Sequence, residues 1–186
     1  MVLSDSHSGL SFMRACIQTV KPDAMIHLGD HFDDGTDMAE EFPHIPMHQV
    51  PGNCDRYRMV AYRPEQLCYP VGGVMLYMTH GHNQKVKMTL ALLKKEAREM
   101  GAKAALFGHT HSALCVQEDG LWLLNPGSCG SFGGSVGLIE TENGQITNCR
   151  ILTHADLIQS PINAYNVACA VQAPTCVGSD YPNKRD

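Results

Sequence analysis

The sequence lacks several features that would assign it to a specialised class of protein. No apolar run approaches the ~18 residues needed to cross a bilayer. The first residues also lack a basic stretch followed by an apolar one, so no secretory signal is predicted. With 44% hydrophobic and 18% charged residues, the chain of 186 is typical of one globular domain. We therefore expect a cytoplasmic protein with no membrane partner.

Basic clusters are also scarce. The formal net charge is −5, and Lys94, Lys95 and Arg98 gather only on the outer face of a predicted helix. Proteins that follow a nucleic-acid backbone usually display a basic stripe. The charge pattern therefore argues against a nucleic-acid partner.

Paired cysteine motifs are missing as well. The eight cysteines are scattered along the chain and form no C-x-x-C motif. In a chain without a secretory signal, this pattern favours reduced, mostly buried thiols over a disulfide framework.

Apolar runs and helical spacing indicate an α/β fold. Runs over residues 24–28, 45–50, 74–79 and 103–107 predict buried strands, and each is followed by a polar motif. Residues 8–20 and 84–100 have helical spacing, and the second of these carries an apolar stripe of Val86, Leu90, Leu93 and Ala97. Strands that alternate with helices predict an α/β sheet.

The chain changes character from Ser112 onward. Short strands are predicted over 113–117, 121–124, 136–139 and 146–152, with turn signals at 118–120 and 142–144. This pattern predicts a β-meander that packs as a second sheet against the first. Periodicity is lost from about residue 153.

The chain is rich in histidine, and most of its ten histidines fall in or near short motifs at predicted strand ends. Five motifs occupy these ends: Asp5-Ser6-His7, Gly29-Asp30, Gly52-Asn53-Cys54-Asp55, His80-Gly81-His82 and Gly108-His109-Thr110-His111. Ligand sites of open α/β sheets lie at the carboxyl ends of strands, so these loops are expected to converge. Carboxylate, imidazole and amide groups suit divalent metals without requiring a thiolate.

Spacing within two of the motifs supports the same interpretation. Residues i and i+2 of an extended segment point to the same side. Asp5 with His7, and His109 with His111, are therefore each expected to aim two ligands into one cavity. Any one motif alone has an ordinary explanation as a turn, a surface histidine or an adventitious site, but five in order favour a metal centre.

As an ordered set, the motifs resemble the calcineurin-like metallophosphoesterase superfamily. They are most similar to its small prokaryotic phosphodiesterase branch, the YfcE type, which carries the same Gly-Asn-Cys-Asp signature. The resemblance covers about residues 1–152, and Asn125-Pro126-Gly127-Ser128 matches another loop of the family. It implies two facing mixed β-sheets flanked by helices, with residues 153–186 as a C-terminal extension of unknown structure.

The resemblance also implies a site with two divalent metal ions. Asp5, His7, Asp30 and His111 would hold one ion, and Asp30, Asn53, His80 and His109 would hold the other, with Asp30 as the bridge. Manganese is the expected metal, with iron, nickel or zinc as alternatives. The implied activity is hydrolysis of a small phosphate ester, most readily a phosphodiester, by in-line attack of a hydroxide that bridges both metals. Asp30 and Asn53 would have catalytic roles, and His82 would contact the substrate phosphate.

Four neighbouring residues stay open at this point. Cys54 would act as a proton donor or as a small buried spacer, and Asp55 would orient it or support a ligand from behind. Arg56 and Arg58 follow the same loop and would bind phosphate or stay solvated.

Two other functions fit the same fold. One is a non-catalytic scaffold for protein binding, as in a eukaryotic retromer subunit, which is favoured only where metal ligands are lost. The other is a nuclease, against which the acidic balance argues. The sequence leaves a homo-oligomer open.

Overall fold

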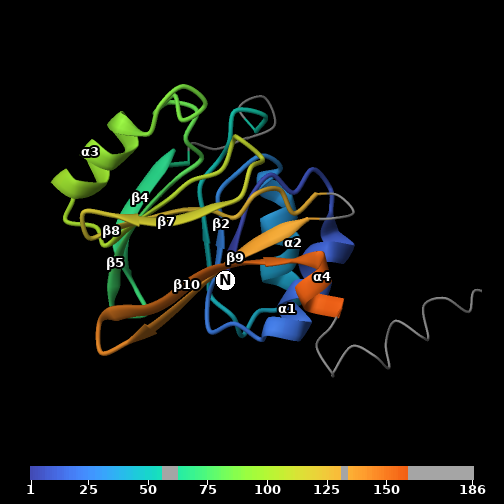
Figure 1. Cartoon of the computed structure of the whole chain (residues 1–186). Helices are drawn as coiled ribbons and strands as arrows, with labels where there is room; N and C mark the ends of the chain where they lie inside the picture. Colours follow the sequence, from blue (N-terminus) through green and yellow to red (C-terminus); the bar gives the residue numbers. More distant parts are fainter. Residues whose placement is uncertain (56–62, 131–133, 159–186) are drawn as a thin grey trace, which may run out of the picture.

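Two five-stranded mixed sheets pack face to face in the computed structural model, which describes residues 1–55, 63–130 and 134–158 (Figure 1). The first sheet has the strand order β10 (Gln145–Thr153), β9 (Ser135–Glu142), β1 (Val2–Leu3), β2 (Met25–His27) and β3 (Met47–Gln49). The second has the order β4 (Gln66–Val71), β5 (Val74–Thr79), β6 (Ala104–Leu106), β8 (Leu121–Asn125) and β7 (Leu114–Glu118). The helices are α1 (Leu10–Val20), α2 (Phe32–Glu41), α3 (Ala91–Glu99) and α4 (His154–Ile158). This architecture confirms the predicted fold class.

Alternating side chains divide the apolar core into three layers, because successive residues of a strand face opposite sides of its sheet. Leu3 packs with Met13 and Ile17 of α1 on the outer face of the first sheet. Val2 faces the other way, into the layer between the sheets. On β5, Leu76 joins that middle layer, and the next residue, Tyr77, packs beneath α3 on the outer face of the second sheet.

Parallel pairing directs the predicted loops to one edge of the sandwich. Strands β1, β2 and β3 run parallel to one another in the first sheet, and β5, β6 and β8 do so in the second. Antiparallel pairs complete each sheet at its margins, β9 and β10 in the first and β4 and β7 in the second. The carboxyl ends of the six parallel strands therefore carry the motifs toward each other.

The predicted meander is not one sheet. Strands β7 and β8 form a hairpin in the second sheet, where β8 pairs with β6, whereas β9 and β10 form a hairpin in the first, where β9 pairs with β1. The hairpins themselves were predicted correctly. Their separation follows from long-range pairing, since each hairpin extends the sheet whose parallel strand it meets.

The helix predicted over 84–100 is shorter than expected. Only α3 is helical, and Lys85 has a left-handed backbone with φ of 54° that interrupts the earlier part. Val86 nevertheless lies in the same core cluster as Leu93 and Ala97, so the predicted apolar stripe does face the core. Three elements were not predicted: the acidic helix α2, the short helix α4, and the edge strand β4, which contains Pro70.

Part of the predicted C-terminal extension continues the fold. Thr153 ends β10, α4 follows directly, and Leu157 is buried in the outer cluster of the first sheet. Residues 159–186 lie outside the described residues, so the boundary at 152 stays a prediction. Among the helices described, none has the length and apolar character to cross a membrane.

The six cysteines within the described ranges are free thiols, three of them buried. Only half of the six are buried, fewer than expected, and their reduced state stays a prediction. Cys169 and Cys176 lie outside the described residues.

Candidate metal centre

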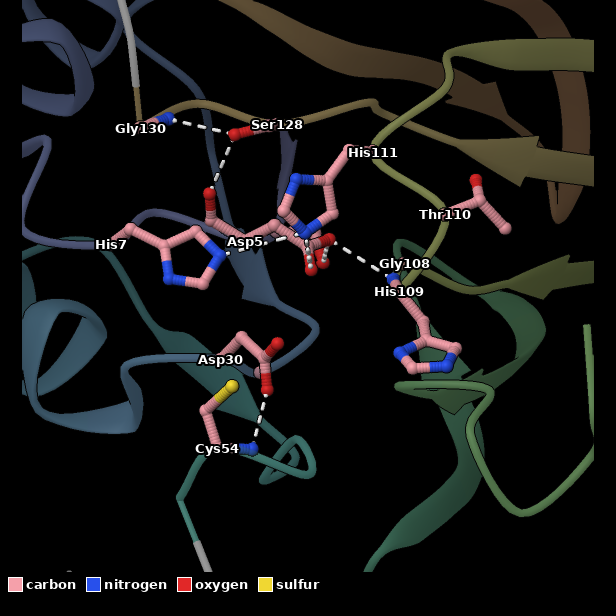
Figure 2. A network of polar contacts seen from close by, with 12 residues as sticks. Asp5, His7, Asp30, Cys54, Gly108, His109, Thr110, His111, Ser128 and Gly130 are labelled. Carbon is pink, nitrogen blue, oxygen red and sulfur yellow. Dashed lines mark hydrogen bonds and ion pairs between the residues drawn. The ribbon is translucent and has the colours of Figure 1, made fainter. Parts of the chain in front are cut away.

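Four predicted ligands meet at the edge of the sandwich from three different loops. Asp5 and His7 follow β1, Asp30 follows β2, and His111 lies in the loop after β6. One ligand atom from each lies within 4.8 Å of every other in the group, which Figure 2 shows from close by. The two aspartates are buried and the two histidines are exposed. The structure thus assembles two buried carboxylates next to two exposed imidazoles.

The side chain of Asp5 indicates what this group is suited to hold. Its Oδ2 accepts hydrogen bonds from the Ser4 hydroxyl at 2.6 Å and from the His109 backbone N–H at 3.0 Å. Its Oδ1 is buried with no hydrogen-bond partner and lies 3.1 Å from Nε2 of His111. A buried anionic oxygen without a donor is costly unless a cation meets it. The arrangement therefore fits a metal ion.

Asp30 lies between this group and a second one. Its Oδ1 accepts the Cys54 N–H at 2.9 Å and lies 3.5 Å from Nε2 of His80. Burial acts to raise the pKa of the Asp30 carboxyl, but His80 and the Cys54 N–H outweigh it, so that the pKa lies below its ordinary value. Asp30 is therefore a carboxylate at neutral pH, and it is within reach of ligands on both sides.

The second group contains His80, Asn53 and His109. Nδ1 of His80 lies 2.8 Å from the Leu28 carbonyl, which only accepts, so this nitrogen carries the proton. In the neutral ring Nε2 then presents a lone pair, 3.2 Å from Oδ1 of Asn53. The Asn53 amide nitrogen points elsewhere, toward the Cys54 sulfur at 3.4 Å. Facing lone pairs on His80 and Asn53, next to the Asp30 carboxylate, again fit a cation.

His109 and His82 complete this side of the site. The rings of His80 and His109 are 5.0 Å apart between centroids, and His82 lies 5.5 Å from the first and 6.2 Å from the second. Burial, followed by nearby positive groups, lowers the pKa of His109 to about 4. His109 is therefore a neutral imidazole at pH 7, which is the form that binds metals. All seven predicted ligands and His82 thus lie around one site.

Comparison with known proteins shows to which family the chain belongs. Residues 1–144 match the model of the calcineurin-like phosphoesterase superfamily domain. The chain belongs to this superfamily. It is 31% identical over 135 residues to a probable metallophosphoesterase, YsnB, of Bacillus subtilis (strain 168), covering 69% of this chain and 73% of that protein.

Solved structures of similar proteins share the fold of this superfamily member. A predicted phosphoesterase from Streptococcus pneumoniae TIGR4 has a TM-score of 0.66 at 26% identity, with 82% of this chain and 87% of that chain covered. A novel archaeal phosphodiesterase has a TM-score of 0.61 at 22% identity, with 82% and 97% covered. Family membership implies the use of divalent metals, with which the Asp/His group agrees.

The backbone of this calcineurin-like site differs from the extended segments that were expected. Five of the seven predicted ligands have positive φ: Asp5 53°, His7 42°, Asp30 55°, His109 67° and His111 58°. The i, i+2 argument is therefore wrong in its reason, although Asp5 and His7 do reach one group. His109 and His111 instead contribute to different groups. Left-handed non-glycine residues are uncommon and often cluster at functional sites.

Asp55 anchors the loop that carries Asn53 and Cys54. One of its oxygens accepts the N–H groups of His31 and Phe32 at 2.9 and 2.8 Å, and the other accepts the Gly52 N–H at 2.7 Å. It is only 2% exposed. The two oxygens thus tie the Gly52–Asp55 loop to the loop after Asp30 and to the start of α2. This contact pattern favours support of the ligand loops over orientation of the Cys54 side chain.

Cys54 has the properties of a neutral spacer, but it is exposed and not buried as expected. Its thiol is exposed and receives the Asn53 amide, while partial burial and then the Asp30 carboxylate raise the pKa of the thiol to about 11. The sulfur therefore stays protonated well above neutral pH. Arg56 and Arg58 lie outside the described residues.

Two more polar residues, Asp34 and Asn125, hold ligand loops in place. The sequence did not predict this role for either of them. Asp34 of α2 accepts the Ser6 hydroxyl and the Ser8 N–H, both at 2.7 Å, and so holds the Asp5–His7 loop. Its signal was hidden because α2 itself was not predicted. Asn125 donates to the Gly108 carbonyl at 2.9 Å and the Thr110 hydroxyl at 3.0 Å, and so holds the His109–His111 loop. The Asn125-Pro126-Gly127-Ser128 motif indicated only a resemblance to the family.

Glycines at two positions allow the loops to approach closely. A Cβ added at Gly52 would overlap the Asp30 carboxylate and backbone. One added at Gly108 would overlap the Ser4 hydroxyl and come within 2.7 Å of Asp5 Oδ2. Any side chain at Gly52 would displace the Asp30 carboxylate, and any at Gly108 would displace Ser4 and the Asp5 carboxylate.

Proposed function

We propose that the protein is a phosphodiesterase that holds two divalent metal ions, with Asp30 shared between them. The observation that carries this proposal is the place of Asp30, whose carboxylate lies in the first ligand group and 3.5 Å from His80 of the second. Superfamily membership supports phosphoester chemistry, and the archaeal structural relative, which is called a phosphodiesterase, supports the choice of diester.

The donor set indicates the class of metal. Asp5 and Asp30 supply carboxylate oxygen, Asn53 an amide oxygen, and the remaining ligands imidazole nitrogen. This mixture suits manganese, iron, nickel or zinc, and manganese is our expectation. Such ions, when bound in a pair, lower the pKa of a water molecule and offset the charge that develops on phosphoryl oxygens.

The charges of the ligands favour an anionic substrate. Only two of the seven ligand side chains, Asp5 and Asp30, are carboxylates, and Asn53 contributes a neutral oxygen. Two carboxylates do not neutralise two divalent ions, so the loaded site would carry net positive charge. A phosphodiester anion is attracted to such a site.

The protein's own groups then divide the work. His80 keeps its Nε2 lone pair aimed inward because its Nδ1–H is bound to the Leu28 carbonyl. Asp5 is held by Ser4 and the His109 N–H, which fixes the direction of its second oxygen. His82 is half-buried beside His80 and His109, where it would hydrogen-bond a phosphoryl oxygen of the bound ester.

Metal content and substrate preference test the proposal together. The protein is purified without chelator, loaded with manganese and analysed for metal per chain. Asp119→Asn, in an exposed turn, is the matched control for Asp30→Asn, which removes the shared carboxylate. We expect two ions per chain in the native protein and in the control, and faster hydrolysis of bis(p-nitrophenyl) phosphate than of p-nitrophenyl phosphate. Protein that binds no metal would instead support the scaffold function, and preferential cleavage of DNA would support a nuclease.

A further inference from the structure

Two cysteine thiols that are not among the metal ligands face each other across the two sheets. Cys115 lies on β7 and Cys149 on β10, and their sulfur atoms are 3.2 Å apart. Strand β7 is an edge of the second sheet and β10 an edge of the first. The pair therefore sits where the open margins of the two sheets come together.

The surroundings keep this pair in one place. Within its own sheet Cys115 is paired with Leu124, and Cys149 is paired with Ile139. Both cysteines belong to the apolar layer between the sheets, in which Leu124 is fully buried. Two strand residues packed in a core have little freedom to separate, so the short distance between the sulfurs is a property of the fold.

We propose that Cys115 and Cys149 form a reversible disulfide that links the two sheets when the protein meets a small-molecule disulfide oxidant. The bond requires an S–S distance of about 2.05 Å, so each sulfur must move by roughly 0.6 Å from its place in the thiol pair. Small rotations of the two side chains supply a movement of this size. The proposal does not depend on the proposed function of the metal centre.

The chemistry proceeds by two exchange steps. The thiolate of Cys115, the more exposed of the two, attacks one sulfur of oxidised glutathione, and one glutathione thiolate leaves and takes up the proton that Cys115 lost. Cys149 then attacks the Cys115 sulfur of the mixed disulfide, and the second glutathione leaves with the proton from Cys149. The protein loses two electrons and two protons, and the oxidant becomes two thiols.

The rate and effect of the reaction follow from the site. Burial raises the pKa of the Cys149 thiol, so the second step should be slow at neutral pH and faster at pH 8.5. The link would close a loop across 34 positions of the sequence and join β7 and β10, which belong to different sheets. Constraint of the unfolded chain by such a loop should raise the midpoint of thermal unfolding by about 5–10 °C.

Peptide mapping tests the pairing directly. The full chain is incubated with oxidised glutathione, its remaining thiols are alkylated, and it is digested by trypsin with a protease that cleaves after glutamate. Cleavage after Lys103, Glu118, Glu142 and Arg150 places Cys115 in residues 104–118 and Cys149 in residues 143–150. Cleavage after Glu140 as well leaves Cys129 in the separate fragment 119–140. We expect the first two fragments as a linked species that dithiothreitol separates.

Two variants and one measurement keep the outcome decisive. Cys68→Ser, on β4, should form the link as the native chain does, whereas Cys115→Ser should lose both the linked fragments and the rise in unfolding temperature. The oxidised and reduced native chains give the same comparison without any substitution. Alkylation of both cysteines after full exposure to oxidant, linkage of either one to a different cysteine, or an unchanged unfolding temperature in the linked protein would each overturn the proposal.

Discussion

The floor of the metal centre and its rim are held in different ways. The floor consists of Asp5, Asp30 and His80, which are 0%, 3% and 0% exposed, and each has a fixed partner behind it. Those partners are Ser4 and the His109 N–H for Asp5, the Cys54 N–H for Asp30, and the Leu28 carbonyl for His80. The rim residues His7 and His111 are exposed and lie against each other, with Nε2 atoms 3.5 Å apart.

This difference suggests two roles: the buried floor would place the proposed ions, and the exposed rim would control access to them. Buried ligands with partners of their own cannot turn away, so the floor would determine where the proposed ions sit. The exposed histidines would then be free to move as an ion or a substrate binds. Substitutions in the floor should therefore cost more than those in the rim, which the following experiments test in order of decreasing effect.

Asp30→Asn should have the largest effect. The amide keeps the shape but removes the anionic oxygen that both ligand groups share, which weakens both proposed sites at once. We expect hydrolysis to fall at least ~10³-fold, a barrier increase of about 4 kcal/mol. Thermal unfolding should show a folded protein, since no apolar cavity is opened. Near-normal turnover with both metals bound would rule out the shared-carboxylate mechanism.

His80→Ala and His7→Ala compare floor with rim through the same chemical loss. We expect the His80 variant to lose activity about 10²-fold and the His7 variant about 10-fold, because only His80 is buried and bound from behind. Metal titration by calorimetry should show the same order. Equal losses would mean that burial does not separate the two classes of ligand.

Asp55→Asn tests support of the floor from outside it. A carboxylate accepts at both oxygens, whereas an amide accepts at only one, so either the Gly52 N–H or the pair from His31 and Phe32 loses its acceptor. Metal affinity should fall about 10–100-fold. Asp37→Asn, at an exposed position of helix α2, is the control and should bind metal normally. A loss of stability with unchanged metal affinity would limit Asp55 to a structural role.

Cys54→Ser should have the smallest effect. A serine hydroxyl can receive the Asn53 amide as the thiol does, so a spacer predicts less than ~10-fold loss of activity. A proton donor would instead cost roughly 10²-fold or more. The ratio of activities on substrates with good and poor leaving groups separates the two roles, because only loss of a donor penalises the poor leaving group selectively.

The convergence of the candidate ligands was predictable because each follows a strand end. A short apolar run followed by Gly-Asp or Gly-His is visible in the sequence, and parallel strands bring such ends together without further information. Strand β5 was predicted with its observed limits, Val74–Thr79, for the same reason. The supports were harder to find. Asp55 contacts backbone groups 23 and 24 positions away, and no local pattern encodes that distance.

Other failures came from long-range pairing and from weak patterns. Whether the hairpin of β9 and β10 joins the first or the second sheet depends on the pairing of Val2 with Gly137, which the local sequence does not reveal. Helix α2 was missed because its buried face is built from Asp34, Gly35 and Met38, of which only one is apolar. The buried face of α2 is largely polar because it contacts the site, so it lacks the apolar stripe by which a core-facing helix is predicted.

The left-handed backbone of five ligands has a thermodynamic consequence. Each such residue costs about 1 kcal/mol relative to an ordinary conformation, and the bonds that hold them, such as the Asp5 N–H to the Gly29 carbonyl at 2.9 Å, come from the protein itself. The cost is therefore met when the chain folds, not when an ion binds. In the proposed metal site, folding stability would thus be exchanged for metal affinity. Relaxing these turns by design should raise the stability of the protein and lower its affinity for metal.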